Sequence, residues 1–436
     1  MNRTLLAALV LAAAPTAAQP VPPPAGDHHL HLLSPAMVAL LTPAHPPAVQ
    51  LPAELDRVLR ERERIAGTST VTDLFTQDAR MVDINGETNW IRGREEIHAS
   101  IGRGRPGWRL VPNAYAVNGS SAWIAANTVR GEGASLRHTS SVLFSLQKEA
   151  DGAWRIAAES GSVRPPSRFA TPLQADSLVR LLDAAGIRRG VVLSLGYLFA
   201  SSFHPTRPDE QERVRAENDW TAAQVARYPD RLVGFCSVNP LKDYAVSEMD
   251  RCTRIPHMRG LKLHFGNSGV DLRNPDHVER VRRVFAAANE RRIPVVAHLW
   301  TVDPTYGREH SEIFLDRIVP AAPDIPIQIA HMGASGPGYH SDEALAVFAD
   351  AAAAGDARVR NLWYDFATLV SADLSEAQVE LATRRIRQMG IERMLFGSDL
   401  DPDVPPRRAW ATFRIMLPLS DDEFRAIADN VPPYLR

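Results

Sequence analysis

The sequence has few of the features that mark several classes of protein. It contains only two cysteines, Cys236 and Cys252, and neither belongs to a Cys-x-x-Cys pattern of the kind used in metal or redox sites. A disulfide between them is compatible with the sequence but is not fixed by it. There is also no internal repeat beyond the strand–helix alternation described below. The chain therefore gives no sign of a thiolate metal site or of a repeat architecture.

An excess of charge of one sign is also missing. The 49 basic and 51 acidic residues give a formal net charge of -2, and the basic residues are spread along the chain rather than collected in one block. Proteins that bind nucleic acids or anionic membranes usually carry a basic patch or stripe. We therefore expect no nucleic-acid partner.

The apolar stretch at the N-terminus is too short to cross a bilayer as a helix. In MNRTLLAALVLAAAPTAAQP, Arg3 provides a positive start, Leu5–Ala14 form an apolar core, and the Ala-Ala pair before Gln19 suits cleavage. Residues 1–18 are therefore predicted to be a signal peptide, and the mature chain to be exported to the periplasm or secreted. A cytosolic protein with an apolar N-terminus is the alternative. No membrane span is expected.

After residue 170 the sequence alternates short apolar runs with helical stretches. This rhythm is typical of βαβ units and a parallel sheet. Together with the opening DHHLHLLSP (27–35), seven later runs give eight strands, which predict a (β/α)₈ TIM barrel of class α/β. Those runs are RRGVVLSLG (188–196), RLVGFCSVNP (231–240), MRGLKLHF (258–265), IPVVAHLW (293–300), IPIQIAHMG (325–333), NLWYDFATL (361–369) and ERMLFGSDLD (392–401).

Residues 54–162 interrupt this rhythm. A helical segment, PAELDRVLRERERIAG, precedes three alternating segments that are separated by polar turns, as in an antiparallel meander. Helix followed by sheet is α+β architecture, so a second domain is predicted between the first and second barrel strands. The chain then divides into the signal peptide, residues 19–53 with the first barrel strand, the insert at 54–162, and the rest of the barrel at 163–436.

The opening strand carries three histidines and an aspartate within five residues. Alternate residues of a strand share a face, so Asp27, His29 and His31 project together while His28 and Leu30 point the other way. His28 is therefore expected to be packed or solvated. A His-x-His pair alone is weak evidence for a metal site.

Polar residues at the ends of later strands strengthen the metal prediction. His298, His331 and Asp399 each follow an apolar run, where the C-terminal mouth of a barrel would place them. Imidazole and carboxylate ligands suit Zn²⁺, Fe²⁺ or Mn²⁺, with one position open to water or substrate.

The ordered motifs resemble the amidohydrolase superfamily. The set is DHHLH, GLKLHF, VVAHLW, QIAHMG and LFGSDLD, and the resemblance covers residues 27–35 and about 171–436. It is closest to the amidohydrolase-related (amidohydrolase 2) branch, which includes aminocarboxymuconate-semialdehyde decarboxylase and 2-pyrone-4,6-dicarboxylate lactonase-type enzymes.

The resemblance implies a role for each of these residues. His29, His31, His298 and Asp399 would hold one divalent ion, with Zn²⁺ as the first choice and Mn²⁺ or Fe²⁺ as alternatives. His331 would orient or polarise the attacking water or the substrate. Asp399 would also accept the proton of the water, because a carboxylate beside a cation stays ionised.

Three further residues are expected to contact the substrate. In GLKLHF, Lys262 and His264 share one face, and we expect Lys262 to bind an anionic group with His264 beside it. The alternatives for Lys262 are pairing with a carboxylate, or carbamylation to bridge two metal ions as in binuclear relatives. Trp300 would line the pocket or serve packing, and Asp365 would orient a ligand histidine or have a structural role. His204, His310 and His340 are expected in solvated loops.

The insert resembles the SnoaL-like, nuclear-transport-factor-2-like cone fold. The residues that carry this resemblance are LFTQDARMVDINGETNWIRGREEI and SVLFSLQKEADGAWRIAAESGS. Its candidate pocket residues, Asp83, Trp90 and His138, form no recognisable catalytic set. We therefore expect a lid or a partner contact, including a homodimer through the insert, rather than independent catalysis.

Three functions remain open from the sequence. The leading prediction is a metal-dependent hydrolase that uses activated water on a small-molecule amide, lactone or ester. A non-oxidative decarboxylase of an unsaturated or aromatic acid is the enzymatic alternative, because metal ligation looks alike in both. An exported ligand-binding protein without turnover is the alternative of another class, although the complete ligand set argues against it.

Overall fold

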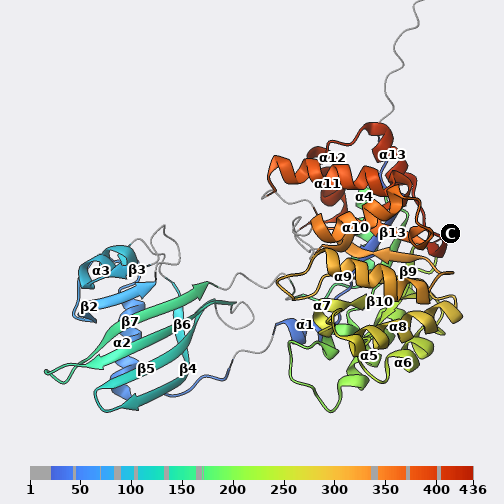
Figure 1. Ribbon diagram of the computed structural model, residues 1–436. Coiled ribbons are helices and arrows are strands. Elements are labelled where there is room, and N and C mark those ends of the chain that lie inside the picture. The colour runs from blue at the N-terminus through green and yellow to red at the C-terminus, as the bar shows by residue number, and fades with distance from the viewer. Residues whose placement is uncertain are drawn as a thin grey trace, which may run out of the picture. The chain divides into compact units, whose positions relative to one another are not determined.

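The computed structural model describes most of the chain. It covers residues 21–42, 46–68, 70–82, 90–102, 107–131, 137–163, 169, 171–334, 342–369, 374–399 and 404–435. The predicted signal peptide lies outside these residues. The chain forms two compact units, one of Met1–Val38 with Thr171–Arg436 and the other of Ala39–Ala170 (Figure 1).

The first unit is built on an eight-stranded parallel sheet that nearly closes into a barrel. Its two ends are joined by backbone hydrogen bonds from His28 N to Phe396 O (2.9 Å) and from Asp399 N to His29 O (2.8 Å). In the order of the sheet the strands are β1 (Gly26–Leu30), β8 (Arg189–Leu193), β9 (Leu232–Ser237), β10 (Met258–His264), β11 (Val295–His298), β12 (Ile327–Ile329), β13 (Leu362–Asp365) and β14 (Met394–Leu395).

Seven of the eight predicted runs contain one of these strands, the first run overlaps β1, which begins one residue earlier, and the strands pair in sequence order. The prediction of a parallel barrel of class α/β is confirmed to this extent. The strands are shorter than the apolar runs that predicted them. Polar residues at the ends of the runs lie at or just beyond the last paired residue, which is where a barrel has its mouth.

Helices follow the strands and cover their outer faces. Local signals set their ends: Asn274 caps α8 by accepting from the backbone N–H of Asp276 at 2.9 Å, and Ser375 forms a capping box with Gln378 at the start of α11. The helices are α1 (Pro35–Leu41), α4 (Ala175–Ala185), α5 (Glu210–Val225), α6 (Ala245–Cys252), α7 (Phe265–Ser268), α8 (Pro275–Glu290), α9 (Arg308–Ile313), α10 (Asp342–Ala353), α11 (Glu376–Met389), α12 (Pro406–Met416) and α13 (Asp421–Asp429).

Alternation along the strands separates an outer core from an inner one. In β8, Val192 packs towards the helices, whereas Val191 and Leu193 belong to a small apolar cluster with Phe235 of β9. Tyr434, in the C-terminal 3₁₀ turn Pro433–Leu435, is part of the same inner cluster. The end of the barrel where the strands begin is therefore filled by side chains.

The second unit is an α+β domain inserted between β1 and β8. The segments that lead into and out of it are joined by an antiparallel bridge between Leu33 and Leu173, so the insertion leaves the barrel strands next to each other. Its elements are α2 (Ala53–Arg64), β2 (Phe75–Val82), β3 (Trp90–Arg92), α3 (Arg94–Gly102), β4 (Arg109–Asn118), β5 (Ser121–Arg130), β6 (Arg137–Lys148) and β7 (Trp154–Val163).

These strands form one six-stranded sheet in the order β3-β2-β7-β6-β5-β4. The third predicted segment of the meander contains two strands, β6 and β7. β2 pairs with β7 in parallel, whereas β4 to β7 are antiparallel neighbours. Helix α2 buries Leu55 and Leu59 in an apolar core beneath the sheet. The SnoaL-like assignment remains a prediction.

Two further features bear on the sequence predictions. Cys236 of β9 and Cys252 of α6 form a disulfide with a Cα–Cα distance of 6.1 Å. Among the described residues, no helix combines the length and the apolarity needed to span a membrane.

Candidate metal centre

Three of the predicted ligands meet where β1 leaves the barrel. His29 Nε2 and His31 Nε2 each lie 3.3 Å from Asp399 Oδ1, and His331 Nε2 lies 3.9 Å from Asp399 Oδ2. The ligand atoms of His29, His31 and Asp399 lie within 4.8 Å of one another, which suits one shared cation. Asp399 is brought here because its N–H bonds to the carbonyl of His29.

The second nitrogen of each ring fixes its tautomer. His31 Nδ1 lies 2.8 Å from the carbonyl oxygen of Leu193, and His331 Nδ1 lies 2.7 Å from that of Ala367. A carbonyl only accepts, so both Nδ1 atoms carry the proton and both Nε2 atoms keep a lone pair. Histidines that bind metals are typically held in this way.

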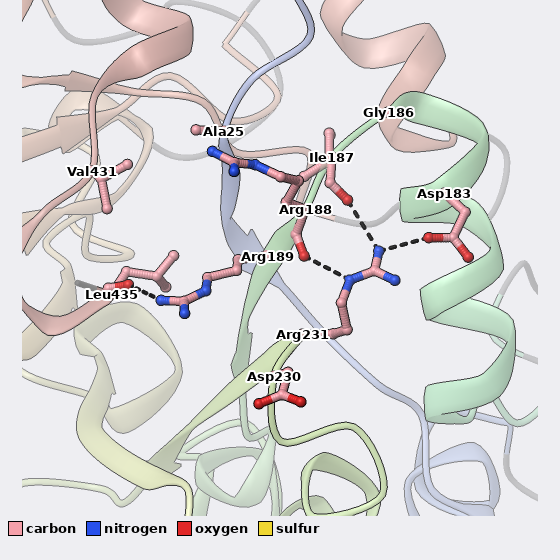
Figure 2. A pocket seen from close by; sticks show the side chains of 10 residues that line it. All are labelled: Ala25, Asp183, Gly186, Ile187, Arg188, Arg189, Asp230, Arg231, Val431 and Leu435. Carbon is pink, nitrogen blue, oxygen red and sulfur yellow. Dashed lines mark hydrogen bonds and ion pairs between the residues drawn. The ribbon is translucent and has the colours of Figure 1, made fainter.

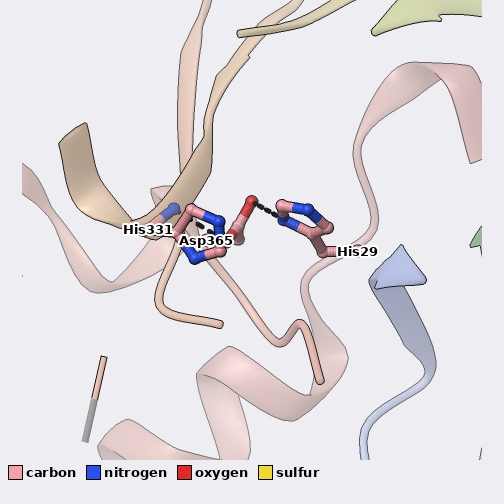
Figure 3. Close-up of side chains that lie close together, drawn as sticks. All are labelled: His29, His331 and Asp365. Carbon is pink, nitrogen blue, oxygen red and sulfur yellow. Dashed lines mark hydrogen bonds and ion pairs between the residues drawn. The ribbon is translucent and has the colours of Figure 1, made fainter. Parts of the chain in front are cut away.

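Asp365 performs the same task for His29. Its Oδ2 lies 3.1 Å from His29 Nδ1, and its Oδ1 accepts from the backbone N–H of His331 at 3.0 Å (Figure 3). The carboxylate also accepts from Gln328 Nε2 at 2.6 Å and from the N–H of Ala367 at 3.2 Å. Because these donors surround the carboxylate, Asp365 orients the metal-facing rings rather than serving as a ligand. Of the two sequence alternatives, the geometry favours the orienting role.

The charges of the cluster are set by burial and by mutual contact. Burial, reinforced by Lys262, lowers the pKa of His29 to about 4, so the ring is neutral at pH 7 as metal binding requires. Burial alone would raise the pKa values of Asp365 and Asp399. Neighbouring His29 and His331 reverse that effect and hold both pKa values well below the ordinary one. Both carboxylates are therefore ionised.

His298 faces the same space from β11. Its ring centroid is 4.7 Å from that of His331, and it stacks on His264 at 3.9 Å because the two residues are register partners in β10 and β11. His298 Nε2 is buried and has no hydrogen-bond partner. A buried nitrogen without a partner is costly unless something else binds it, and a cation would.

His264 is held in place by Asn267. Its Nδ1 accepts from the N–H of Asn267 at 3.2 Å, and its Nε2 lies 3.0 Å from Asn267 Nδ2. Both ring nitrogens are engaged and the ring stacks on His298, while contact of His264 with a substrate stays a prediction. Trp300 is half-buried and packs on Gly266, where an added Cβ would lie 3.1 Å from the indole ring.

Lys262 points into the barrel beneath this cluster. It is buried, and its Nζ lies 3.3 Å from His29 Nε2. Burial lowers its pKa to about 8. No carboxylate within 4.0 Å of Lys262 occurs among the described residues, so the predicted structural ion pair is not formed there. An ammonium at this position suits an anionic group bound beside the metal position.

Backbone strain is concentrated around the same residues. Six non-glycine residues of the described chain have positive φ, and four of them are His331 (51°), Met332 (52°), Thr368 (50°) and Asp399 (57°). Each such residue costs about 1–3 kcal/mol and persists only where its surroundings enforce it. Strain of this kind clusters at functional sites, which agrees with the location of the ligands.

The donor set therefore fits a divalent cation. It offers neutral imidazole nitrogens with their lone pairs directed inward, an ionised carboxylate, and the unpaired Nε2 of His298.

Comparison with known proteins agrees with this chemistry. The sequence pattern of the amidohydrolase family matches residues 203–430, which is more than half of the chain. The chain belongs to the amidohydrolase family. Enzymes of this family are generally metal-dependent. No curated protein matches the sequence.

Several solved structures resemble this amidohydrolase at low identity. An uncharacterized TIM-barrel protein from Bordetella bronchiseptica is 19% identical over 58% of this chain and 79% of that one, with a TM-score of 0.41. 5-Carboxyvanillate decarboxylase from Sphingomonas paucimobilis is 18% identical over 57% of this chain and 79% of that one, with a TM-score of 0.40. 2,6-Dihydroxybenzoate decarboxylase from Rhizobium is 18% identical over 58% of this chain and 85% of that one, with a TM-score of 0.39. Likenesses this distant carry no information about the substrate.

The amidohydrolase also uses residues that the sequence did not single out. Gln328 lies inside the apolar run of β12 and bonds to Asp365. Tyr197, which follows β8, is buried against His264 with ring centroids 5.1 Å apart. Burial and the nearby Asp399 raise the pKa of Tyr197, so it remains a neutral hydroxyl. A polar residue inside a buried strand run is the only signal that could have identified Gln328.

Other histidines behave in three ways. His28 is packed edge-on against Tyr434, 6.5 Å between centroids, and His204 is exposed. His310 was expected in a solvated loop, but it is 1% exposed in α9, where its Nδ1 accepts from the N–H of Gly307. That expectation was wrong because the loop after β11 folds into a helix that packs on the barrel. His340 lies outside the described residues.

The insert of the amidohydrolase contributes no comparable cluster within the part of the chain that the structure describes. Trp90 is 53% exposed, whereas Asp83 and the side chain of His138 lie outside the described set. Among the described residues, two groups have ligand atoms close enough to share a cation, and both belong to the barrel: His29, His31 and Asp399, and His29, His331 and Asp365.

A cavity of about 860 Å³ lies at the other end of the barrel, where β1, β8 and β9 begin (Figure 2). Two of its three arginines are engaged in structural bonds: Arg231 binds Asp183 at 2.7 Å, and Arg189 donates to the carbonyl of Leu435. Catalytic residues of TIM barrels lie at the opposite, C-terminal face. This cavity is therefore not the candidate site.

Proposed function

We propose that this amidohydrolase is a metal-dependent hydrolase acting on an amide, lactone or ester bond of a small molecule with an anionic group. The observation that carries the proposal is the convergence of the Nε2 atoms of His29 and His31 on the ionised carboxylate of Asp399, with His298 Nε2 buried and unpaired nearby. A divalent cation held there would supply Lewis acidity, which activates water and polarises a carbonyl. We propose Zn²⁺, with Mn²⁺ or Fe²⁺ as alternatives.

The protein groups divide the remaining work. Asp399 is ionised and has one oxygen towards His29 and His31 and the other towards His331, so it can take a proton from water between them. His331 keeps a lone pair on Nε2 and can orient the same water. Lys262 would bind the anionic group of the substrate from the barrel interior.

Non-oxidative decarboxylation is the second candidate, and the buried Lys262 is the observation that favours it. An ammonium beside the ligand cluster would hold a substrate carboxylate next to the cation position. The two reactions are therefore distinguished by their products and not by the metal content of the protein.

The first experiment is elemental analysis of the purified protein and of His29→Ala and Asp399→Asn, with His204→Ala as a matched control. Loss of a ligand should lower metal affinity by at least about 100-fold, because loss of a hydrogen-bond partner of a ligand alone accounts for 10–100-fold. The control should keep the wild-type metal content, since His204 is exposed. If the wild type holds no metal, or if both ligand variants retain it, the metal-dependent proposal is wrong.

The second experiment measures products on a panel of amides, lactones, esters and aromatic acids, with CO₂ quantified directly. Hydrolytic products that disappear in Asp399→Asn would support the hydrolase. Release of CO₂ without any hydrolytic product would instead establish the decarboxylase.

We also propose that the protein works in an oxidising compartment after export. The Cys236–Cys252 disulfide supports this, because such bonds persist in the periplasm and outside cells and are rare in the cytosol. Detection of the free thiols in protein isolated from its native compartment would contradict the proposal.

A further inference from the structure

A chain of buried hydrogen bonds connects the C-terminal turn to the metal-facing histidine of β1. Tyr434, in the turn Pro433–Leu435, donates its hydroxyl to Gln328 Oε1. Gln328 Nε2 donates to Asp365 Oδ2 at 2.6 Å, and that same oxygen lies 3.1 Å from His29 Nδ1. Gln328 and Asp365 are completely buried, so water does not compete for these bonds.

The direction of every bond in this chain is determined. Gln328 Nε2 faces two groups that only accept, the carboxylate of Asp365 and the carbonyl of His28 at 3.1 Å. The amide oxygen must therefore face Tyr434, and the phenol must donate to it. Asp365, fixed by this amide and by the backbone N–H groups of His331 and Ala367, in turn accepts from Nδ1 of His29. The Nε2 lone pair of His29 is thereby directed towards Asp399.

Tyr434 itself is firmly anchored. Its ring packs edge-on against Phe235 with centroids 5.3 Å apart, and the following carbonyl of Leu435 accepts from Arg189 (Figure 2). The turn thus closes the end of the barrel where the strands begin, while the hydroxyl of Tyr434 extends into the barrel interior. None of the contacts of Tyr434 involves a predicted metal ligand directly.

We propose that Tyr434 and Gln328 are positioning residues for metal binding, which act on His29 through Asp365. This inference rests on the proposed metal-dependent function, but it concerns residues at the far end of the barrel from the cation. The C-terminal turn is then part of the metal centre in function, as well as a plug of the barrel.

Removal of the phenol hydroxyl has a definite consequence. In Tyr434→Phe, Gln328 Oε1 is buried without a donor, and the amide loses the contact that holds its oxygen. The amide is then held from one side only, so its bond to Asp365 Oδ2 weakens and the carboxylate and the ring that it holds are less firmly fixed. We expect roughly a three- to tenfold loss of metal affinity, less than the 10–100-fold known for direct partners of ligands.

The matched control is Tyr364→Phe. Tyr364 is also a buried barrel tyrosine, and it is adjacent to Asp365 in β13, but its hydroxyl has no hydrogen-bond partner. The control therefore removes the same atom without touching the chain of bonds. It should leave metal affinity within the error of the wild type.

The test uses the full chain, freed of metal and titrated with Co²⁺. Affinity is measured by competition with a chelator, and the visible absorption spectrum of bound Co²⁺ reports ligand geometry independently of turnover. We expect weaker binding and a shifted spectrum in Tyr434→Phe and neither change in Tyr364→Phe. A Tyr434→Phe protein with wild-type affinity and spectrum would overturn the proposal, even if its melting temperature fell.

A second variant covers the case in which Tyr434→Phe does not fold. Gln328→Met removes the amide between Tyr434 and Asp365, and it should weaken Co²⁺ binding by at least as much. When both single variants fold, the double variant should bind no more weakly than Gln328→Met, because Tyr434 acts only through the amide. Wild-type affinity in Gln328→Met, or additive losses in the double variant, would refute the chain. Absence of Co²⁺ binding in the wild type would instead refute the proposed function.

Discussion

The two units of the chain differ in how their buried polar side chains are bonded. The barrel encloses His29, Lys262, Gln328, His331 and Asp365, none of them more than 5% exposed, and connects most of them by hydrogen bonds. The core of the insert is mostly apolar, although polar residues such as His98 and Asn127 are buried there as well. One of its buried arginines, Arg62, is 7% exposed and is bonded twice to Glu159.

This difference separates the unit that contains the candidate metal centre from the unit in which the described residues form no such cluster. Buried charges and strained backbone reduce stability unless the surrounding structure compensates for them, and proteins retain them mainly where they serve a function. In the insert the buried ion pair is isolated, so it should affect only the folding of that unit. In the barrel a change to one buried group should alter the properties of its neighbours.

The largest effect on stability is expected for Glu159→Gln in the insert. The change leaves the Arg62 guanidinium buried, stacked 5.3 Å above Trp108 and without its counter-charge. Breaking a buried pair in this way should lower the unfolding free energy of the insert by about 3 kcal/mol.

Calorimetry should show this as a shift of one transition while the metal content of the barrel is unchanged. Glu61→Gln, which breaks the exposed pair with Arg64 in α2, is the matched control and should cost less than about 0.5 kcal/mol. Loss of metal in Glu159→Gln would show that the two units are coupled and would break the comparison.

Asp365→Asn should produce the complementary result in the barrel. An asparagine cannot accept from all the donors around position 365, so His29 is pushed towards the tautomer that carries its proton on Nε2. Metal affinity should fall 10–100-fold, equivalent to about 1.4–2.7 kcal/mol, because the metal-facing lone pair is lost.

Metal titration with thermal unfolding of the apo protein measures both consequences. Asp316→Asn, which removes an exposed partner of Arg358 in the same unit, is the control. If Asp365→Asn lowered apo stability but kept wild-type affinity, the carboxylate would be structural only.

A smaller effect is expected from Glu217, a buried carboxyl in α5 that accepts from Ser34 Oγ at 2.5 Å. Burial raises its pKa to about 7. A raised pKa means that the folded state binds the proton more tightly, so this stabilisation is complete below about pH 4.5 and is lost as the pH rises through 7.

Glu217→Gln removes the dependence of the unfolding free energy on pH that Glu217 causes. Relative to the wild type, the variant should gain between about 1 and 2.5 kcal/mol on going from pH 5 to pH 8. Urea unfolding of both proteins at the two pH values measures the difference. An unchanged difference would show that Glu217 is ionised in the fold at both values.

Local patterns were sufficient to predict the strands and the residues that meet at the barrel mouth. Apolar runs with polar ends located all eight barrel strands, and His29, His31 and Asp399 lie together at the mouth as the order of motifs implied. Strand alternation also placed Lys262 and His264 on the inner face. These features depend on periodicity and on strand order, which a sequence displays directly.

Contacts between distant segments were not predictable in the same way. Gln328 resembles any polar residue in an apolar run, and Tyr434 resembles any aromatic residue near a terminus, until the barrel brings them together. The engagement of both His264 nitrogens depends on a turn that begins only after β10 ends. Such roles are set by packing, which has no signature in local spacing.

The position of β1 has a consequence for how the protein is made. One edge of this strand pairs with β8 and the other bonds to Phe396, so both neighbours are synthesised long after it, and one of them near the end of the chain. Contacts of such high sequence separation slow folding and leave strand edges exposed to wrong partners. Barrel closure must therefore wait for the last strand, and a fragment that ends before Asp399 cannot assemble the ligands. Metal binding at these residues would thus also report that the last barrel strand has been synthesised and has closed the barrel.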